Sequence, residues 1–185
     1  MDNANQEQTI LIELDQASRT KQLDRAKLWF DNVLLTQASY RQLLEDTAAK
    51  IEEPHIRQYL TEMINQEEKH EEQARELFSL IDREPSDVRQ LLGTAMGKVR
   101  QALGDFIAIA GGAKGPWQDL HQLYLANYNS MGAFAVAEQL GLALGIPRIV
   151  EITFAVVAEK STNQLLLQES VLEMCSMSIL YKEDF

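Results

Sequence analysis

Four prolines stand at regular intervals along this chain of 185 residues, and they constrain its fold more than any other feature. Each precedes a helical pattern of apolar residues: Pro54, Pro85, Pro116 and Pro147. Proline is tolerated in the first turn of a helix, where its missing N–H loses no partner, but it interrupts a helix further in. The prolines therefore divide the chain into five predicted helices, over about residues 19–52, 54–81, 87–110, 117–145 and 148–176.

The links between the predicted helices are of two kinds. Only a residue or two around Glu53 separates the first pair, and the last pair is joined through Gly145, Ile146 and Pro147. Links this short force each pair into an antiparallel hairpin. About 35 residues lie between the hairpins, and their own helix, 87–110, has one continuous apolar stripe that should pack on the bundle. This connectivity predicts an all-α, ferritin-like four-helix bundle with an extra helix on the long crossover.

Length and composition fit one domain. With 45% hydrophobic residues, a chain of 185 can bury a substantial core without disulfides or a structural metal. We expect the bundle to cover 17–176, between an N-terminal extension, 1–16, and a C-terminal tail, 177–185. The segment Thr9 to Leu14, apolar and rich in isoleucine, could form a strand-like extension.

Charge excludes several classes of partner. The formal net charge of −11 and pI near 4.7 oppose binding to nucleic acid and to anionic lipid. The stretch from Leu120 to Ala137 carries no charge, but it contains histidine, glutamine, asparagine and serine, which lipid would penalise. The first residues lack the features of a signal peptide, and Cys175 is the single cysteine. We therefore expect a cytoplasmic protein with no nucleic-acid or membrane partner.

Polar residues interrupt the predicted core. Glu67 falls in the apolar stripe of the second helix with His70 beside it, and E-x-x-H is the spacing at which ferritin-like metal proteins hold one ion. Glu159 and Asn163 lie on the inward face of the last helix. Burying a lone carboxylate is costly unless it is paired, protonated or metal-bound. Glu67, His70 and Glu159 are therefore candidate metal ligands.

The two partner helices offer weaker ligands. Tyr40 on the first helix and Asn127 on the third occupy the central positions that face Glu67 and Glu159. With Asn163, they would line the site without supplying a carboxylate.

The chain resembles the YciF-like stress proteins of the ferritin-like superfamily. The resemblance covers about Lys21 to Gln168, and it is clearest in two stretches, Glu67-Glu68-Lys69-His70 running on to Phe78, and Tyr124 through Ala143-Leu144-Gly145-Ile146 to Glu159-Lys160. It implies glutamates at the positions of Tyr40, Glu67, Asn127 and Glu159, a histidine near His70, and a link to stress. Glu67, His70 and Glu159 match this pattern, whereas Tyr40 and Asn127 depart from it.

Three functional hypotheses follow. The first is a ferritin-like bundle with a degenerate site, holding at most one Fe, Mn or Zn ion weakly through Glu67, His70 and Glu159. The second is an active di-iron or di-manganese oxidoreductase or iron-binding protein, for which two carboxylates leave the charge of two cations poorly compensated. The third is a non-catalytic, self-associating module. The sequence identifies no catalytic residue. It favours a protein that is not an enzyme, and it does not determine a reaction class.

Self-association follows from the third long helix. Between Leu120 and Pro147, Glu138 is the one charged side chain, so helix 117–145 has no charged face to turn to solvent. We expect a homodimer through helix 117–145.

Overall fold

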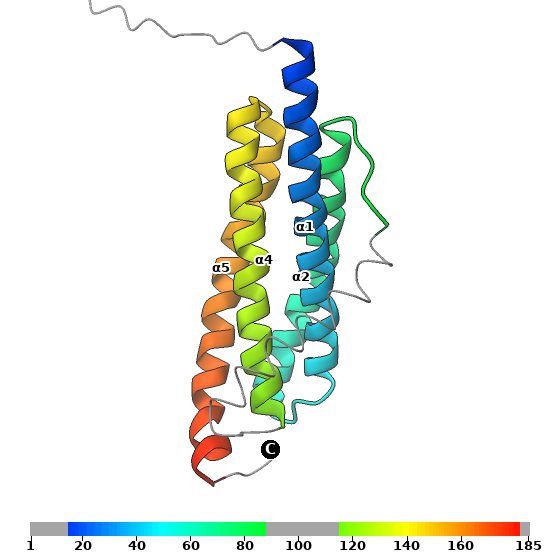
Figure 1. The fold of residues 1–185 in the computed structure, drawn as a ribbon. Coiled ribbons are helices and arrows are strands. Elements are labelled where there is room, and N and C mark those ends of the chain that lie inside the picture. The colour runs from blue at the N-terminus through cyan, green and yellow to red at the C-terminus, as the bar shows by residue number, and fades with distance from the viewer. Residues whose placement is uncertain (1–14, 88–114, 182–185) are drawn as a thin grey trace, which may run out of the picture.

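The computed structural model describes residues 15–87 and 115–181. Within these ranges the protein is all-helical and contains no strand. Four long helices run side by side (Figure 1): α1 (Gln16–Ala48), α2 (Pro54–Ser79), α4 (Pro116–Leu144) and α5 (Pro147–Ser176). A short π-helix, η1 (Met177–Tyr181), continues α5.

Local chemistry sets the helix boundaries. Asp15 caps α1, because its side chain accepts a hydrogen bond from the Ser18 N–H at 3.0 Å. The other three long helices each begin with a proline. Gly145 ends α4 in the left-handed conformation, at φ 68°, and the Ile146 N–H donates back to the Gly141 carbonyl.

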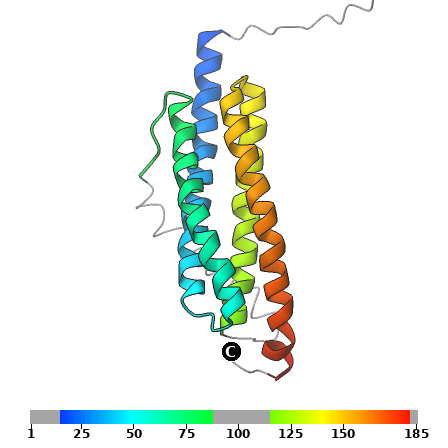
Figure 2. The ribbon, with the colours of Figure 1, turned by 180° about the vertical axis from the view of Figure 1, so that it is seen from behind.

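Two antiparallel hairpins make the bundle. α1 packs on α2, α4 packs on α5, and contacts of α1 with α4 and of α2 with α5 close the ring (Figures 1 and 2). The end of α2 lies by the start of α1, where Arg83 pairs with Asp24. The start of α4 lies by the end of α1, where Lys50 pairs with Asp119. α2 therefore ends at one end of the bundle, and α4 begins at the other.

The core consists of two apolar clusters, one toward each end of the bundle. The first includes Phe30, Phe78, Phe134 and Ile149, and the second includes Tyr40, Leu60, Leu120 and Leu167, with every long helix contributing to both. Gly141 lets α4 and α5 approach closely, since a Cβ there would stand 2.7 Å from a methyl group of Ile149. Between the clusters, the inward positions are polar.

The all-α prediction is confirmed for the described residues. The structure starts α1 at residue 16 and ends it at 48, against the predicted 19 and 52, and the other three helices differ by at most two residues at either end. The expected tail begins in helical conformation, because η1 follows α5 directly. The predicted helix 87–110, apart from its first residue, and the strand-like segment Thr9 to Leu14 lie outside the described residues.

Candidate functional site

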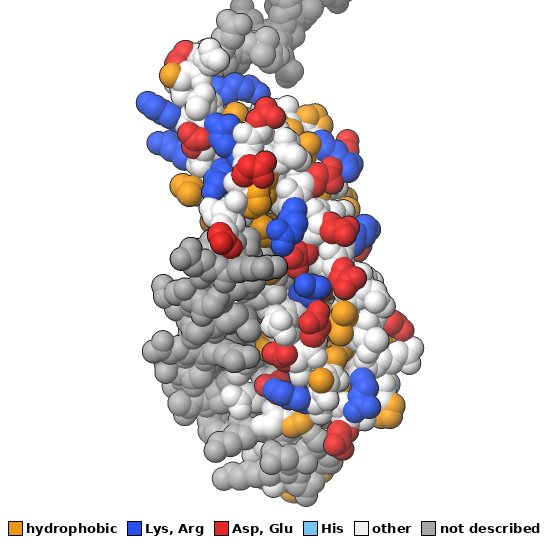
Figure 3. Space-filling view, turned by 90° about the vertical axis from the view of Figure 1, so that its right-hand side faces the viewer, with side chains coloured by type: hydrophobic (Ala, Val, Ile, Leu, Met, Phe, Trp, Pro, Cys, Tyr) orange, Lys and Arg blue, Asp and Glu red, His pale blue; other side chains and the backbone are white. Residues whose placement is uncertain are grey.

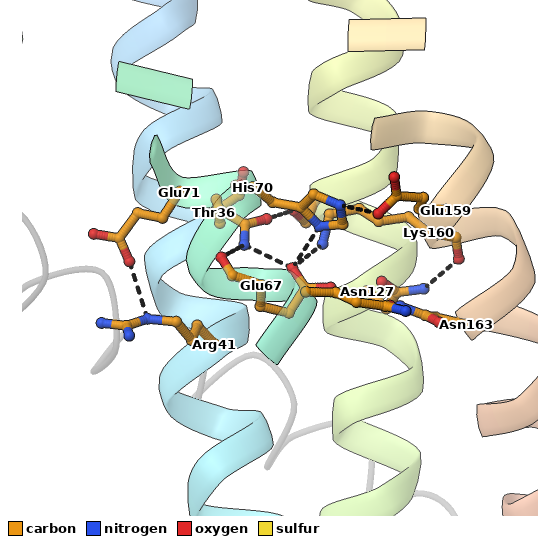
Figure 4. A network of polar contacts seen from close by, with 12 residues as sticks. Thr36, Arg41, Glu67, His70, Glu71, Asn127, Glu159, Lys160 and Asn163 are labelled. Atoms are coloured by element: carbon orange, nitrogen blue, oxygen red, sulfur yellow. Dashed lines mark hydrogen bonds and ion pairs between the residues drawn. The ribbon is translucent and has the colours of Figure 1, made fainter. Parts of the chain in front are cut away.

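A polar layer crosses the bundle at mid-height, between the two apolar clusters (Figure 4). Each helix contributes inward side chains that are 5% exposed or less, namely Gln37 from α1, Glu67 and His70 from α2, Asn127 and Ser130 from α4, and Lys160 and Asn163 from α5. Interiors accept such groups only when their charges and hydrogen bonds find partners. The layer is therefore the strongest candidate for a site in the described part of the chain.

Glu67 is the centre of this layer. Its Oε2 accepts from the Lys160 ammonium at 2.7 Å and from the Gln37 amide at 2.7 Å. Gln37 in turn accepts from the Ser130 hydroxyl at 3.0 Å. The other carboxylate oxygen of Glu67, Oε1, is buried and has no hydrogen-bond partner among residues 15–87 and 115–181. One oxygen thus carries the whole interaction with the neighbouring helices.

His70 lies between two carboxylates. Its Nδ1 is 3.2 Å from Glu67 Oε2, and its Nε2 is 3.0 Å from Glu159 Oε2. A neutral imidazole has a single N–H, so both contacts are hydrogen bonds only when the ring carries two protons. Glu159 lies at the rim, with its side chain 38% exposed, and also meets Lys69 at 3.6 Å. The layer therefore reaches solvent through Glu159.

The charges of the layer stabilise one another. Burial raises the pKa of Glu67, but the ammonium of Lys160 and the hydrogen bond and charge of His70 outweigh burial and lower that pKa to about 2. Burial lowers the pKa of Lys160, an effect that Glu67 partly offsets. The pKa of Tyr40 is raised well above its usual value by burial and by the nearby charge of Glu67. Glu67 is thus an anion and Tyr40 a neutral phenol at neutral pH.

The structure brings only some of the candidate residues together. Glu67, His70 and Glu159 form one chain of contacts. Tyr40 presents its ring face to the Lys160 ammonium, 4.2 Å from the ring centroid, a cation–π contact. The Tyr40 hydroxyl is buried and has no hydrogen-bond partner in the part of the chain that the structure describes.

The two asparagines make hydrogen bonds of their own. Asn127 donates to the Lys160 carbonyl and to the Gln164 side chain, and Asn163 donates to Gln66. Neither contacts Glu67, His70 or Glu159 through a hydrogen bond that would place it in that chain. They fill space in the layer and connect α5 to its neighbours.

The residues as arranged do not fit a metal ion. A shared ion would need Glu67, His70 and Glu159 to aim at one point, but the His70 ring stands between the two carboxylates and each ring nitrogen faces one of them. The Lys160 ammonium already occupies the position on Glu67 Oε2 that a cation would take. In residues 15–87 and 115–181, no cluster of three or more histidine, cysteine, aspartate or glutamate side chains is grouped to hold a metal.

Sequence reasoning missed three members of the layer, Lys160, Gln37 and Ser130. Lys160 continues the core positions Ile149, Val156, Asn163 and Leu167 at helical spacing, so its place on the buried face is visible in the sequence. Lysine is rarely buried unless paired, and its partner lies on another helix. The pairing is therefore visible only once the helices are assembled.

A second feature lies on the outside of α4 and α5. Five large apolar side chains there are more than half exposed, namely Tyr128, Leu142, Phe154, Leu165 and Leu172. The Ser161 hydroxyl donates to the Met131 sulfur at 3.3 Å, which places these outer positions of the two helices side by side. Two charged residues of α5 pair toward α2, Arg148 with Glu76 and Glu173 with His55. We call these five residues, with the small residues between them, the outer α4–α5 face.

The side of the bundle around α2 differs from this face. Its surface mixes acidic and basic side chains (Figure 3). Arg41 pairs with Glu71, and Arg75 pairs with the same glutamate. Of the described helices, none is both long enough and apolar enough to cross a membrane.

Comparison with known proteins identified no similar protein. Neither a protein family, nor a curated protein, nor a solved structure matches this chain.

Proposed function

We propose that this protein is a ferritin-like bundle with a degenerate metal site, and that it works as a non-catalytic module that pairs with a second copy of itself through the outer α4–α5 face. The observation that carries the proposal is the row of exposed apolar side chains on these two helices. This interface extends the sequence-based expectation, which named helix 117–145 alone, to include α5. The link to stress that the YciF-like resemblance implies belongs to the same proposal.

The ferritin-like assignment is supported by connectivity and by the polar layer. Two hairpins joined by one crossover along the bundle is the arrangement of ferritin-like proteins. Glu67 and His70 on α2 and Glu159 on α5 stand at mid-height, where such bundles hold ligands. Lys160 in the same layer supplies a positive charge from the chain itself.

The size of the outer face supports a second copy as its partner. Tyr128 and Phe154, 63% and 64% exposed, each leave roughly 130 Å² uncovered if an aromatic side chain offers about 200 Å². Three leucines add similar exposed surface, and the exposed small residues Gly132, Ala158 and Ser161 lie between. The total approaches the roughly 800 Å² that each partner buries in a standard interface.

Charge favours the same choice. Two chains that each carry −11 repel one another, so the approach is least unfavourable along α4, which presents few charges. On α4, Glu138 is the one charged residue after Asp119. A twofold dimer would place the outer α4–α5 face of one copy against the same face of the other.

The test is the mass of the protein in solution. Light scattering at micromolar concentration should give about 42 kDa, twice the 21.0 kDa of one chain. Leu165→Glu combined with Leu172→Glu should give the monomer, because four carboxylates would enter the dimer interface. Leu28→Glu is the matched control, since Leu28 is 67% exposed on α1, away from this face, and should leave the dimer intact. A wild-type protein of 21 kDa throughout would contradict the proposal.

The second candidate is a single Fe, Mn or Zn ion at Glu67, His70 and Glu159. The observation that favours it is the 3.2 Å distance between Glu67 Oε2 and His70 Nδ1, which suits two ligands of one ion, whereas Glu159 would have to leave the Nε2 side of the ring to join them. The ion would have to displace the Lys160 ammonium from Glu67, which explains why we propose at most weak binding. Elemental analysis of freshly purified protein tests this candidate, and a stoichiometric metal would favour it over the degenerate site.

A further inference from the structure

We infer that the Lys160 ammonium is a built-in substitute for a bound cation, and that its removal lets Glu67 and the Nδ1 of His70, which is 3.2 Å from Glu67 Oε2, bind a divalent transition-metal ion. The inference does not rest on the dimer, because it concerns the interior of one chain. It rests on where Lys160 lies, on what Lys160 leaves behind, and on the chemistry of the remaining groups.

Lys160 occupies the position of a cation. Its side chain is fully buried, its ammonium is 2.7 Å from Glu67 Oε2, and the ring of Tyr40 lies 4.2 Å below it. An ammonium has three N–H donors, and Glu67 Oε2 is the acceptor that lies within hydrogen-bond distance. Lys160 thus acts here mainly as a positive charge for Glu67, which is the part that a metal ion plays beside a buried carboxylate.

The groups around Lys160 have bonding capacity that the chain does not use. Glu67 Oε1 and the Tyr40 hydroxyl are both buried and have no hydrogen-bond partner within the described residues. Loss of Lys160 would also free Glu67 Oε2 from its closest cation. Among the described residues, Glu67 would then have one oxygen, Oε1, without a partner, and a second, Oε2, held only by the Gln37 amide and the His70 ring.

The remaining ligands select the class of metal. A carboxylate with an imidazole three residues away on one helix suits Zn²⁺, Co²⁺, Fe²⁺ or Mn²⁺, whereas Ca²⁺ and Mg²⁺ prefer sites built from oxygen alone. Glu159 contacts Nε2 on the opposite side of the His70 ring, so it holds the ring from the rim and does not face the ion. Water would complete the coordination, as in metal sites with few protein ligands.

The charge balance explains why the unmodified protein should not hold such an ion. A divalent ion at Glu67 would stand close to the Lys160 ammonium in a region of low dielectric, where like charges repel strongly. Removal of the Lys160 side chain therefore ends the repulsion of a metal ion and leaves the buried Glu67 carboxylate without its closest positive charge.

The experiment compares metal binding by the full-length protein and its variants. We expect Lys160→Ala to bind one Zn²⁺ per chain by calorimetry, roughly 100-fold more tightly than the wild type. Co²⁺ should give the same stoichiometry and the visible absorption bands of a protein-bound ion. Zn²⁺ should also raise the melting temperature of the variant and leave that of the wild type unchanged, because a ligand that binds only the folded state stabilises it.

Three controls make the outcome specific. Lys160→Arg keeps the positive charge and should bind no better than the wild type. Lys160→Ala with Glu67→Ala should lose the gain. Lys50→Ala removes a lysine that is 56% exposed and pairs at the surface with Asp119, and it should change nothing.

The test also works if the Lys160→Ala variant does not fold without metal. If Lys160→Ala is unfolded alone, the inference predicts that Zn²⁺ restores its helical circular dichroism, and Lys160→Gln, which keeps a donor beside Glu67, is measured in the same way. The inference is wrong if Lys160→Ala and Lys160→Gln bind Zn²⁺ and Co²⁺ no more tightly than the wild type, or if both stay unfolded with Zn²⁺. The wild-type mass is unaffected by either result, so this failure is separate from failure of the dimer.

Discussion

Acidification should remove the buried Glu67–Lys160 pair, and the loss can be calculated. Glu67 has its pKa lowered from 4.5 in the unfolded chain to about 2 in the folded protein. Each tenfold change in proton affinity is worth about 1.4 kcal/mol, so the ionised carboxylate contributes about 3 kcal/mol to the free energy of unfolding at neutral pH. Because the folded-state pKa is depressed, this contribution is present above pH 4.5 and is lost as the pH falls toward 2.

Urea denaturation between pH 5 and pH 2 measures this loss. The comparison protein is Glu67→Gln with Lys160→Met, which replaces the pair by uncharged groups of similar size and should itself be near neutral at pH 7. We expect the wild type to lose about 3 kcal/mol more than this variant over that range. Both proteins keep Glu159 and the surface carboxylates, so the difference isolates the buried pair.

Two parallel pH profiles would refute this reasoning, because they would show that Glu67 titrates alike in the folded and unfolded chains. Single variants provide a further check. Glu67→Leu leaves the Lys160 ammonium buried without its anion and should cost about 3–5 kcal/mol at pH 7, whereas the double variant should not. A thermodynamic cycle over the single and double variants gives the coupling energy directly.

Two further predictions concern packing and iron. Gly141→Ala should lower the free energy of unfolding by about 1–3 kcal/mol, because the added methyl group meets Ile149 at 2.7 Å. Gly132→Ala has nothing within 4 Å and should be neutral or stabilise the helix by up to about 1 kcal/mol, with both variants measured in urea at one protein concentration. Anaerobic titration with Fe²⁺ should give fewer than two irons per chain and no rapid oxygen consumption, since Tyr40 and Asn127 supply no bridging carboxylate. Tyr40→Glu with Asn127→Glu should raise the iron stoichiometry, and two irons with fast oxygen consumption in the unmodified protein would favour the oxidoreductase instead.

The helices and their pairing could be predicted because their causes are local. Pro54, Pro116 and Pro147 begin the helices at which the sequence places them, since a proline is accommodated in the first turn whatever surrounds it. Gly145 adopts a positive φ next to Pro147, and so few residues between α4 and α5 permit only an antiparallel hairpin. Helical periodicity also placed Glu67 and His70 at the core before any neighbour was known.

Which side chains contact one another across different helices was decided by the tertiary structure alone. Neighbouring residues on a helix point about 100° apart, so Glu159 and Lys160 cannot share one environment. The packing of α5 against α2 places the lysine beside Glu67 and leaves Glu159 at the rim. Whether a buried carboxylate meets a metal or an ammonium depends on a residue 93 positions away in sequence, which no local pattern reports. The outer α4–α5 face has the same origin, because exposure is a property of the assembled bundle and not of either helix.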